Sequence, residues 1–327
     1  MPTPRVTALV EHLSPAWFVP VMGWIGLGLS WARASHGLGE PAQLISLWCA
    51  IAASFLLGLV SLCMVWRWIH HPQAVLADIR HPIKHTFWSA LPIGMVLLAA
   101  LWIGLEHTDH WAMKVFWWIG ALGEMATTFW LLARWLRPVD AGGTPLTSLT
   151  PIIFLPLIGN VLVPWAGVPL GHATWSSLQM GIGVFLWPVA LTLLLVRQFQ
   201  VGPLPARMSP TWFILVVPPS AVALSLNLFD PPMTLLWAVW GIGLISLMCA
   251  LTQSRAIINL SFGMTHWGMS FPLAAFTSMT LMMAQQPEGD GLWMPGMALL
   301  AITSVVILWL SRMTLRGLWR GELLRPE

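Results

Sequence analysis

The stretch Ser270-Phe271-Pro272-Leu273-Ala274-Ala275-Phe276 places a proline inside a long apolar run, directly after a phenylalanine. Four earlier apolar runs also contain a central proline, and these are Pro20, Pro92, Pro156 and Pro218. A proline inside a helix removes one backbone hydrogen bond, and its ring clashes with the preceding turn. We therefore predict five helices that bend or break at these prolines.

The composition is that of a membrane protein. Of the 327 residues 57% are hydrophobic and only 8% are charged, whereas a soluble domain has roughly 25% charged residues. A membrane-spanning helix needs about 20 mostly apolar residues. Ten segments approach that description, and we predict an all-α membrane protein whose ten transmembrane helices cover approximately residues 16–32, 44–65, 86–105, 111–133, 151–168, 173–196, 211–229, 233–251, 266–283 and 292–310.

The basic residues support this count of spans. If both termini are cytoplasmic, 13 of the 15 Lys and Arg residues fall on the inner side, and only Arg33 and Lys114 fall outside. Such an excess is typical of cytoplasmic loops. Tryptophan occurs 23 times, often near predicted helix ends, as in the aromatic belts of membrane proteins. The basic residues form no single patch, so we expect the lipid bilayer and no nucleic acid as a partner.

The five prolines fall on the odd-numbered spans, and Pro188 in the sixth span is the exception. This alternation predicts a single transmembrane domain, residues 1–327, built from one bent and one straighter helix repeated five times. Five equivalent bent helices can close into an inner ring around a central pore. The alternative is that these prolines are incidental, since membrane helices tolerate proline. The predicted helical hairpins are approximately 16–65, 86–133, 151–196, 211–251 and 266–310.

The predicted pore lining consists of the five prolines and of small or polar residues on the same spans, namely Gly94, Asn160, Ser220 and Ala275. Small residues let helices pack closely or leave room for a solute. No Lys or Arg lies at the middle of an odd span. Anion selectivity would then come from helix dipoles and from donors such as Asn160, Ser220 and Thr277, which favours a weakly binding channel.

The proline motifs also carry a family resemblance. They are Arg80-His81-Pro82, Leu91-Pro92, Phe154-Leu155-Pro156, Val217-Pro218-Pro219 and Trp267-Gly268-Met269-Ser270-Phe271-Pro272. In their order and spacing, over nearly the whole chain, the sequence resembles the tellurite-resistance/C4-dicarboxylate transporter (TehA-like) family, which includes the guard-cell slow anion channels. The resemblance implies ten helices, a pseudo-fivefold pore in each protomer, a homotrimer, anion conduction and a bacterial inner membrane.

Phe271 matches the phenylalanine that members of this family place across the pore as a gate. An aromatic ring in a narrow pore excludes water and makes ion passage costly until the ring rotates. The alternative is an ordinary core or lipid-facing phenylalanine. Pro272 stands where bacterial TehA-like members carry glycine, and this difference could change how easily the ring swings aside.

Two further sets of ionisable residues are candidates for a functional role. Arg80, His81, Lys84 and His85 precede the third span and could concentrate anions at a cytoplasmic entrance, or could simply anchor the topology. Glu124 lies deep in a span, where an ionisable group is costly. It is either a proton-linked site or a protonated packing residue.

No metal or cofactor is expected. The ten histidines lie at span ends or in loops, whereas membrane haem proteins need histidines that face each other within spans. Two clusters contain potential metal ligands: Glu106, His107, Asp109 and His110 on the outer side, and His70, His71, His81 and His85 on the inner side. Neither cluster has the ligand spacing of a tetrahedral zinc site.

Three functions remain in view. The first is an anion channel or facilitator that acts on small anions without covalent chemistry. The second is a proton-coupled carrier of C4-dicarboxylates or tellurite. The third is an enzymatic or electron-transfer subunit, which is disfavoured because no pair of a nucleophile and a base lies at membrane depth.

Overall fold

The computed structural model describes residues 10–106 and 111–325, and every regular element in these residues is a helix. The longer helices are α2 (Val19–Leu38), α3 (Glu40–His70), α5 (Ala90–Glu106), α6 (Trp111–Trp135), α9 (Ala173–Val201), α11 (Met233–Leu251), α13 (Ser270–Ala284) and α14 (Trp293–Trp319). The shorter ones are α4 (Pro72–Arg80), α7 (Phe154–Leu162), α8 (Pro164–Gly167), α10 (Val217–Leu226) and α12 (Ser254–Ile258).

The predicted proline helices share a junction between two helix types. A 3₁₀ segment leads directly into each α-helix, and these segments are Pro15–Phe18 before α2, Lys84–Ser89 before α5, Pro151–Ile153 before α7, Ala206–Val216 before α10 and Met264–Met269 before α13. Each proline is the second or third residue of its α-helix. A first-turn N–H has no intrahelical partner, so proline costs little there. The expectation of a mid-helix bend is therefore corrected: the prolines mark where an α-helix begins.

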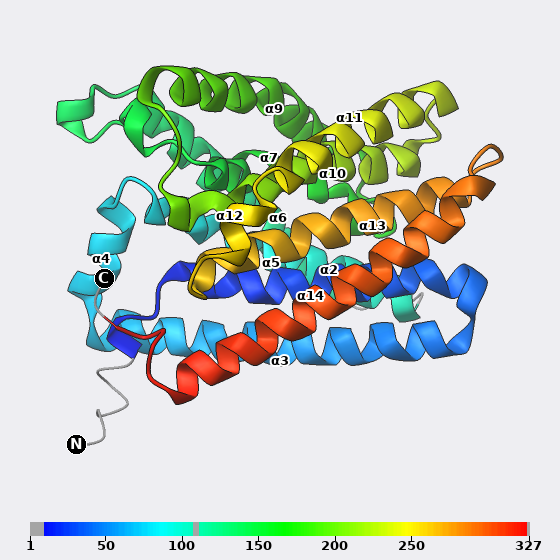
Figure 1. Ribbon diagram of the computed structural model, residues 1–327, viewed down its shortest axis with the longest axis horizontal. Coiled ribbons are helices and arrows are strands. Elements are labelled where there is room, and N and C mark those ends of the chain that lie inside the picture. The colour runs from blue at the N-terminus through cyan, green and yellow to red at the C-terminus, as the bar shows by residue number, and fades with distance from the viewer. Residues whose placement is uncertain (1–9, 107–110, 326–327) are drawn as a thin grey trace.

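These five helices contact one another in chain order. α2 packs against α5, α5 against α7, α7 against α10, α10 against α13, and α13 returns to α2. Each of them also packs against the next long helix of the chain, as the side-by-side pair α2 and α3 illustrates (Figure 1). The first and last described residues lie at the same end of the bundle (Figure 1).

The other long helices expose far more apolar surface. In the most hydropathic windows of α3, α6, α9, α11 and α14 only 22–33% of residues are buried, against 61% and 67% for the segments that contain α5 and α10. Exposed side chains such as Phe55, Phe129 and Phe185 suit these outward faces to lipid.

Seven helical segments of the described chain are long and apolar enough to cross a membrane. They contain α3, α5, α6, α9, α10, α11 and α14. The predicted spans 16–32, 151–168 and 266–283 coincide with helices outside this set. An all-helical membrane protein is thus confirmed, and the count of ten spans stays a prediction.

Candidate functional site

A cavity of about 780 Å³, here called the inner cavity, opens at the end of the bundle that carries α4 and both ends of the described chain. Charged side chains of both signs line its mouth, namely Arg67, Lys84, Arg207, Arg325, Glu11, Asp78 and Glu322. Farther along the helices its walls are apolar, because there they consist of Met22, Ile93, Leu162, Val217 and Phe271. The cavity thus leads from a charged mouth to an apolar floor.

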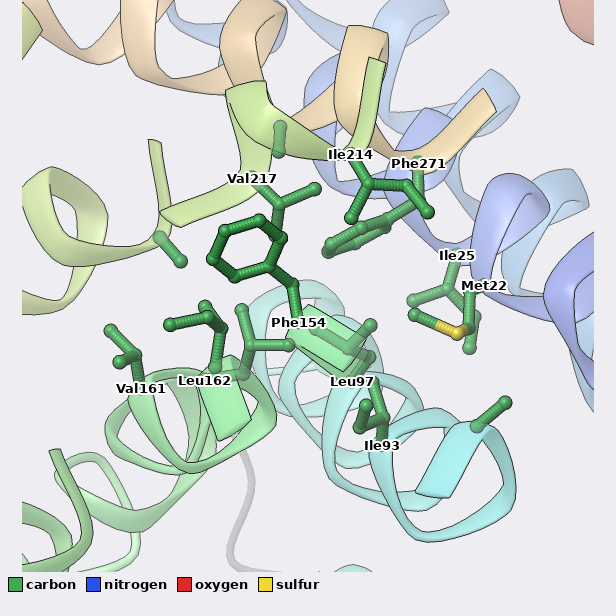
Figure 2. Close-up of a cluster of buried hydrophobic side chains, with 14 of the residues drawn as sticks. Met22, Ile25, Ile93, Leu97, Phe154, Val161, Leu162, Ile214, Val217 and Phe271 are labelled. Carbon is green, nitrogen blue, oxygen red and sulfur yellow. The ribbon is translucent and has the colours of Figure 1, made fainter. Parts of the chain in front are cut away.

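The floor is one side of a cluster of buried apolar side chains that we call the apolar layer. Figure 2 shows the rings of Phe271 and Phe154 within it, with Ile214 and Val217 on one side and Leu97 on the other. No member is more than 8% exposed. α2, α5, α7, α10 with its leading 3₁₀ segment, and α13 all contribute to the layer, whose members are Met22, Ile25, Ile93, Leu97, Phe154, Val161, Leu162, Ile214, Val217 and Phe271.

Phe271 rests directly on the backbone of α2. A Cβ atom added at Gly26 would lie 3.0 Å from Cδ2 of Phe271 and 2.9 Å from Cβ of Ala274. A larger residue at position 26 would therefore displace the ring or separate α2 from α13. The absence of a side chain on Gly26 is what lets this ring lie flush with the neighbouring helix.

A second cavity of about 210 Å³, here called the outer cavity, lies on the far side of the apolar layer. The five inner helices or their extensions again supply its walls, which are Leu29, Ala32, Arg33, His36, Ala100, Gly104, Trp165, Leu224, Leu228 and Ser278. On three helices, the last residue that lines the inner cavity lies seven positions before the first residue that lines the outer cavity, as Met22 and Leu29 do on α2. Seven residues of α-helix span about 10 Å, which is the thickness of the layer.

Most of the five prolines that were predicted to line the pore do not line a cavity. Of the five, only Pro272 lines the inner cavity, although all are buried. Pro92 faces α6, where its atoms lie against Gly120 and Gly123. The carbonyl of Pro156 accepts a hydrogen bond from Thr128 of α6. Successive helical residues point about 100° apart, so residues next to the prolines, such as Ile93 and Val217, face the cavity instead.

The other predicted lining residues also face away from both cavities. Gly94 lies against Leu57 of α3, and Ala275 is buried without lining either cavity. The Ser220 hydroxyl donates to the carbonyl of Val216 at 2.7 Å. Thr277 donates to the carbonyl of Leu273, and its hydroxyl lies 3.0 Å from that of Thr303 on α14. These hydroxyl groups serve helix packing.

Asn160 belongs to a buried network between α6, α7 and α9. Its Nδ2 donates to the Thr128 hydroxyl at 2.7 Å, and its Oδ1 accepts from Gln179 at 3.0 Å. Gln179 also donates to the carbonyl of Ala121 and accepts from the Trp175 indole at 2.7 Å. The amide of Asn160 therefore holds outer helices to α7.

This placement predicts the effect of Asn160→Ala. We expect a loss of about 1–3 kcal/mol of stability, because buried partners are left without a hydrogen bond. Anion selectivity should not change, since the side chain faces away from the cavities. Thermal unfolding and reversal potentials of the purified protein measure the two quantities. A shift in selectivity at unchanged stability would contradict this assignment.

The predicted cytoplasmic entrance is only partly assembled. His81 and Lys84 line the inner cavity, whereas Arg80 is exposed away from it. His85 is buried, with its ring edge against Trp130 at a centroid distance of 5.4 Å. The Lys84 ammonium lies 3.8 Å from Oδ1 of Asp78, so this carboxylate offsets part of the positive charge.

Asp78 also anchors the end of α3. Its Oδ2 lies 2.7 Å from Nη1 of Arg67, and both side chains are less than 10% exposed. Nε of Arg67 donates to the carbonyl of Glu11 at 2.9 Å. The pair therefore joins α3, α4 and the segment that leads into α2.

Glu124 of α6 is fully buried and lies against Gly159 of α7, which lines the inner cavity. A Cβ atom at Gly159 would overlap the Glu124 carboxyl group, so glycine is what leaves room for it. Oε2 accepts a long hydrogen bond of 3.4 Å from Thr127, and Oε1 has no hydrogen-bond partner within the described chain. The carboxyl group therefore lies next to Gly159 and close to Ile93, and both of these residues line the inner cavity.

In the described parts of the chain, no group of three or more His, Cys, Asp or Glu side chains is placed to hold a metal ion. The predicted outer cluster falls largely outside the described residues, because His107, Asp109 and His110 belong to the 107–110 gap.

A family model described as a voltage-dependent anion channel matches residues 12–315. The chain belongs to this family. The resemblance carried by the proline motifs is thus confirmed, and the protein is a multi-pass membrane protein of an anion and dicarboxylate transporter family.

Three relatives are similar to this chain over most of its length. An uncharacterised transporter of Methanocaldococcus jannaschii is 26% identical over 294 residues, 83% of each chain. An S-type anion channel of Arabidopsis thaliana is 24% identical over 242 residues, 72% of this chain and 44% of the plant protein. A Schizosaccharomyces pombe protein whose name proposes malic acid transport is 22% identical over 246 residues, 69% of this chain and 55% of that protein.

Three residues around the two cavities were not predicted from the sequence. Phe154 lies in the apolar layer with Phe271, Asp78 neutralises cations at the inner mouth, and Arg33 lines the outer cavity. One signal was present: Phe154 precedes Pro156 by two residues much as Phe271 precedes Pro272.

Proposed function

We propose that the protein is a passive anion channel or facilitator whose path runs between the five proline helices, from the inner to the outer cavity. The observation that carries the proposal is the apolar layer between the two cavities, to which all five helices contribute and in which Phe271 lies. Membership of an anion channel family supports the same reading.

Phe271 acts as a gate in this proposal. An anion that enters a dry apolar layer of about 10 Å loses its hydration without gaining a charged partner, so the closed path is blocked by desolvation. Phe154 adds a second ring to the block. Conduction begins when the Phe271 ring leaves the layer and water connects the two cavities.

The topology belongs to the same proposal. α2, α5, α7, α10 and α13 form the inner ring of five helical hairpins, and the five outward helices face lipid or neighbouring subunits. Ten spans then leave both termini in the cytoplasm, with the inner cavity at the cytoplasmic face of a bacterial inner membrane. The homotrimer is carried over from the family resemblance.

Weak binding favours a channel over a carrier. The apolar layer contains no cation, and the nearby hydroxyls of Ser220 and Thr277 donate to backbone carbonyls. Anion preference would then arise at the charged cavities on either side. Covalent chemistry has no part in the proposal.

The second candidate is a proton-coupled carrier of C4-dicarboxylates or tellurite. The observation that favours it is the Glu124 carboxyl group, which has an oxygen without a described partner and lies against Gly159, a residue that lines the inner cavity. A proton-linked site needs an ionisable group near the transport path, and Glu124 meets that requirement.

Glu124→Gln separates the two candidates. In a passive channel we expect unchanged anion flux at any pH gradient, because glutamine keeps the shape of a protonated carboxyl group. In a coupled carrier the substitution abolishes the dependence of flux on a proton gradient. Proteoliposomes with and without an imposed pH gradient provide the measurement, and Glu288→Gln, a change at an exposed side chain, is the matched control.

A further inference from the structure

The outer cavity carries a charge pattern unlike that of the inner one. Arg33 and His36 are its basic residues, and its described lining contains no Asp or Glu. The inner cavity instead sets four Lys and Arg residues against three carboxylates. The outer cavity thus has the same formal excess of positive charge in about a quarter of the volume.

Arg33 also differs from the other basic residues that sit partly inside the protein. Arg67 pairs with Asp78, and Arg134 donates to the carbonyl of Ile79 at 2.9 Å. The guanidinium of Arg33 has no hydrogen-bond or ion-pair partner within the described chain, and it faces the cavity on a partly buried stretch of α2. Its five N–H donors are therefore available to a ligand.

The remaining walls define the size and polarity of a ligand. Leu29, Leu224 and Leu228 are apolar, and the Trp165 indole already donates to Ser225 at 2.9 Å. The Ser278 hydroxyl lies 2.9 Å from that of Ser30. The guanidinium is thus the main polar group of the cavity, and its planar fork matches a planar oxyanion through two parallel hydrogen bonds.

We propose that the outer cavity is an anion-binding site in which Arg33, assisted by His36, takes a small planar oxyanion such as nitrate or a carboxylate. The proposal rests on the proposed channel function, to which it adds an outer recruitment site. An anion held there lies directly beyond the apolar layer and enters the path when Phe271 moves. Arg33 is then a specificity-determining residue.

A competing role for Arg33 is structural. Both basic residues stand near the C-terminal end of α2, where positive charge stabilises the helix dipole. Such a role would appear in the stability of the protein at every anion concentration. It would not make that stability depend on which anion is present.

The first experiment measures binding without transport. Thermal unfolding of the full-length protein in detergent is followed while sodium nitrate replaces sodium chloride at constant ionic strength. We expect nitrate to raise the midpoint by a few degrees in the wild type and in Arg312→Gln, an exposed control on α14, but not in Arg33→Gln. Arg33→Lys should retain part of the shift, because it keeps the charge and loses the fork.

Every other outcome overturns the site. A wild type without a nitrate-dependent shift shows that no such site binds, and equal shifts in the wild type and Arg33→Gln place the anion elsewhere. A lower midpoint in Arg33→Gln with an unchanged nitrate shift assigns Arg33 to the helix dipole. This experiment does not depend on conduction.

The second experiment adds transport in the Phe271→Ala background. Arg33→Gln should raise the half-saturating nitrate concentration on the outer side by at least about tenfold, the loss expected for a charge-assisted hydrogen bond. An unchanged half-saturating concentration overturns the recruitment role. If nitrate stabilises the protein through Arg33 but no variant conducts, the binding site stands and the proposed channel function fails.

Discussion

Replacing Phe271 with alanine should raise the anion conductance of the protein at least about tenfold, the change produced by lowering a barrier by about 1.4 kcal/mol. The substitution removes an aromatic ring from the centre of the apolar layer, where the side chain is 3% exposed. Water can then connect the inner and outer cavities, and an anion no longer crosses a dry layer. Macroscopic currents from purified protein in planar bilayers, normalised to protein amount, measure the effect.

Phe276→Ala is the matched control for this prediction. Phe276 lies on the same helix and is equally buried, but its ring stacks on Trp240 of α11 at a centroid distance of 6.2 Å. Both substitutions should cost about 3–5 kcal/mol of packing. Only Phe271→Ala should conduct. Equal conductance of the two variants would mean that loosened packing, and not the loss of a gate, opens the path.

Asp78→Ala should destabilise the fold by about 3–5 kcal/mol, because it leaves the charge of Arg67 buried without its partner. The Arg67 side chain is 4% exposed and lies 2.7 Å from the carboxylate. Loss of the pair also releases α4 and the segment before α2, which meet at Arg67. Chemical or thermal unfolding in detergent measures the change.

Asp140→Ala is the control, since Asp140 is exposed in the Val139–Ala141 segment. The double variant Arg67→Met with Asp78→Leu should recover much of the lost stability, because neither charge then remains buried alone. If Asp78→Ala is as stable as Asp140→Ala, the pair does not anchor this end of the bundle.

The positions of the helices were predictable from the sequence because each apolar run is long and bounded by charged or loop residues. The predicted span 173–196 lies within α9, and the span 233–251 coincides with α11. The prolines also located the 3₁₀ to α junctions, although not their form. Proline is compatible with the first turn of a helix, so the same residue signals either a bend or a start.

Which side of each helix faces the cavities was not predictable from residue type. Asn160 and Ser220 were expected to face a solute. In the structure the Asn160 amide forms hydrogen bonds with Thr128 and Gln179, and the Ser220 hydroxyl donates to a backbone carbonyl. A buried polar side chain is satisfied by whichever partner lies nearest. In a uniformly apolar helix no amphipathic pattern reveals that direction.

Contacts between residues on different helices were also not predictable from the sequence. Asp78 and Arg67 meet because α4 folds back against the end of α3, and neither residue signals this alone. Arg33 was read only as one of two basic residues on the outer side. Its position at a cavity became evident once α5, α8, α10 and α13 were seen to supply the other walls.

The central claim is that the apolar layer around Phe271 separates the two cavities, and cysteine accessibility tests it most directly. Ala32, which lines the outer cavity, is replaced by cysteine after the native Cys49, Cys63 and Cys249 have been removed. A membrane-impermeant thiol reagent is then applied from the side of the inner cavity. We predict no labelling with Phe271 intact and rapid labelling with Phe271→Ala, while labelling from the opposite side is fast in both. Equal labelling from the inner side with and without the Phe271 ring would contradict the account.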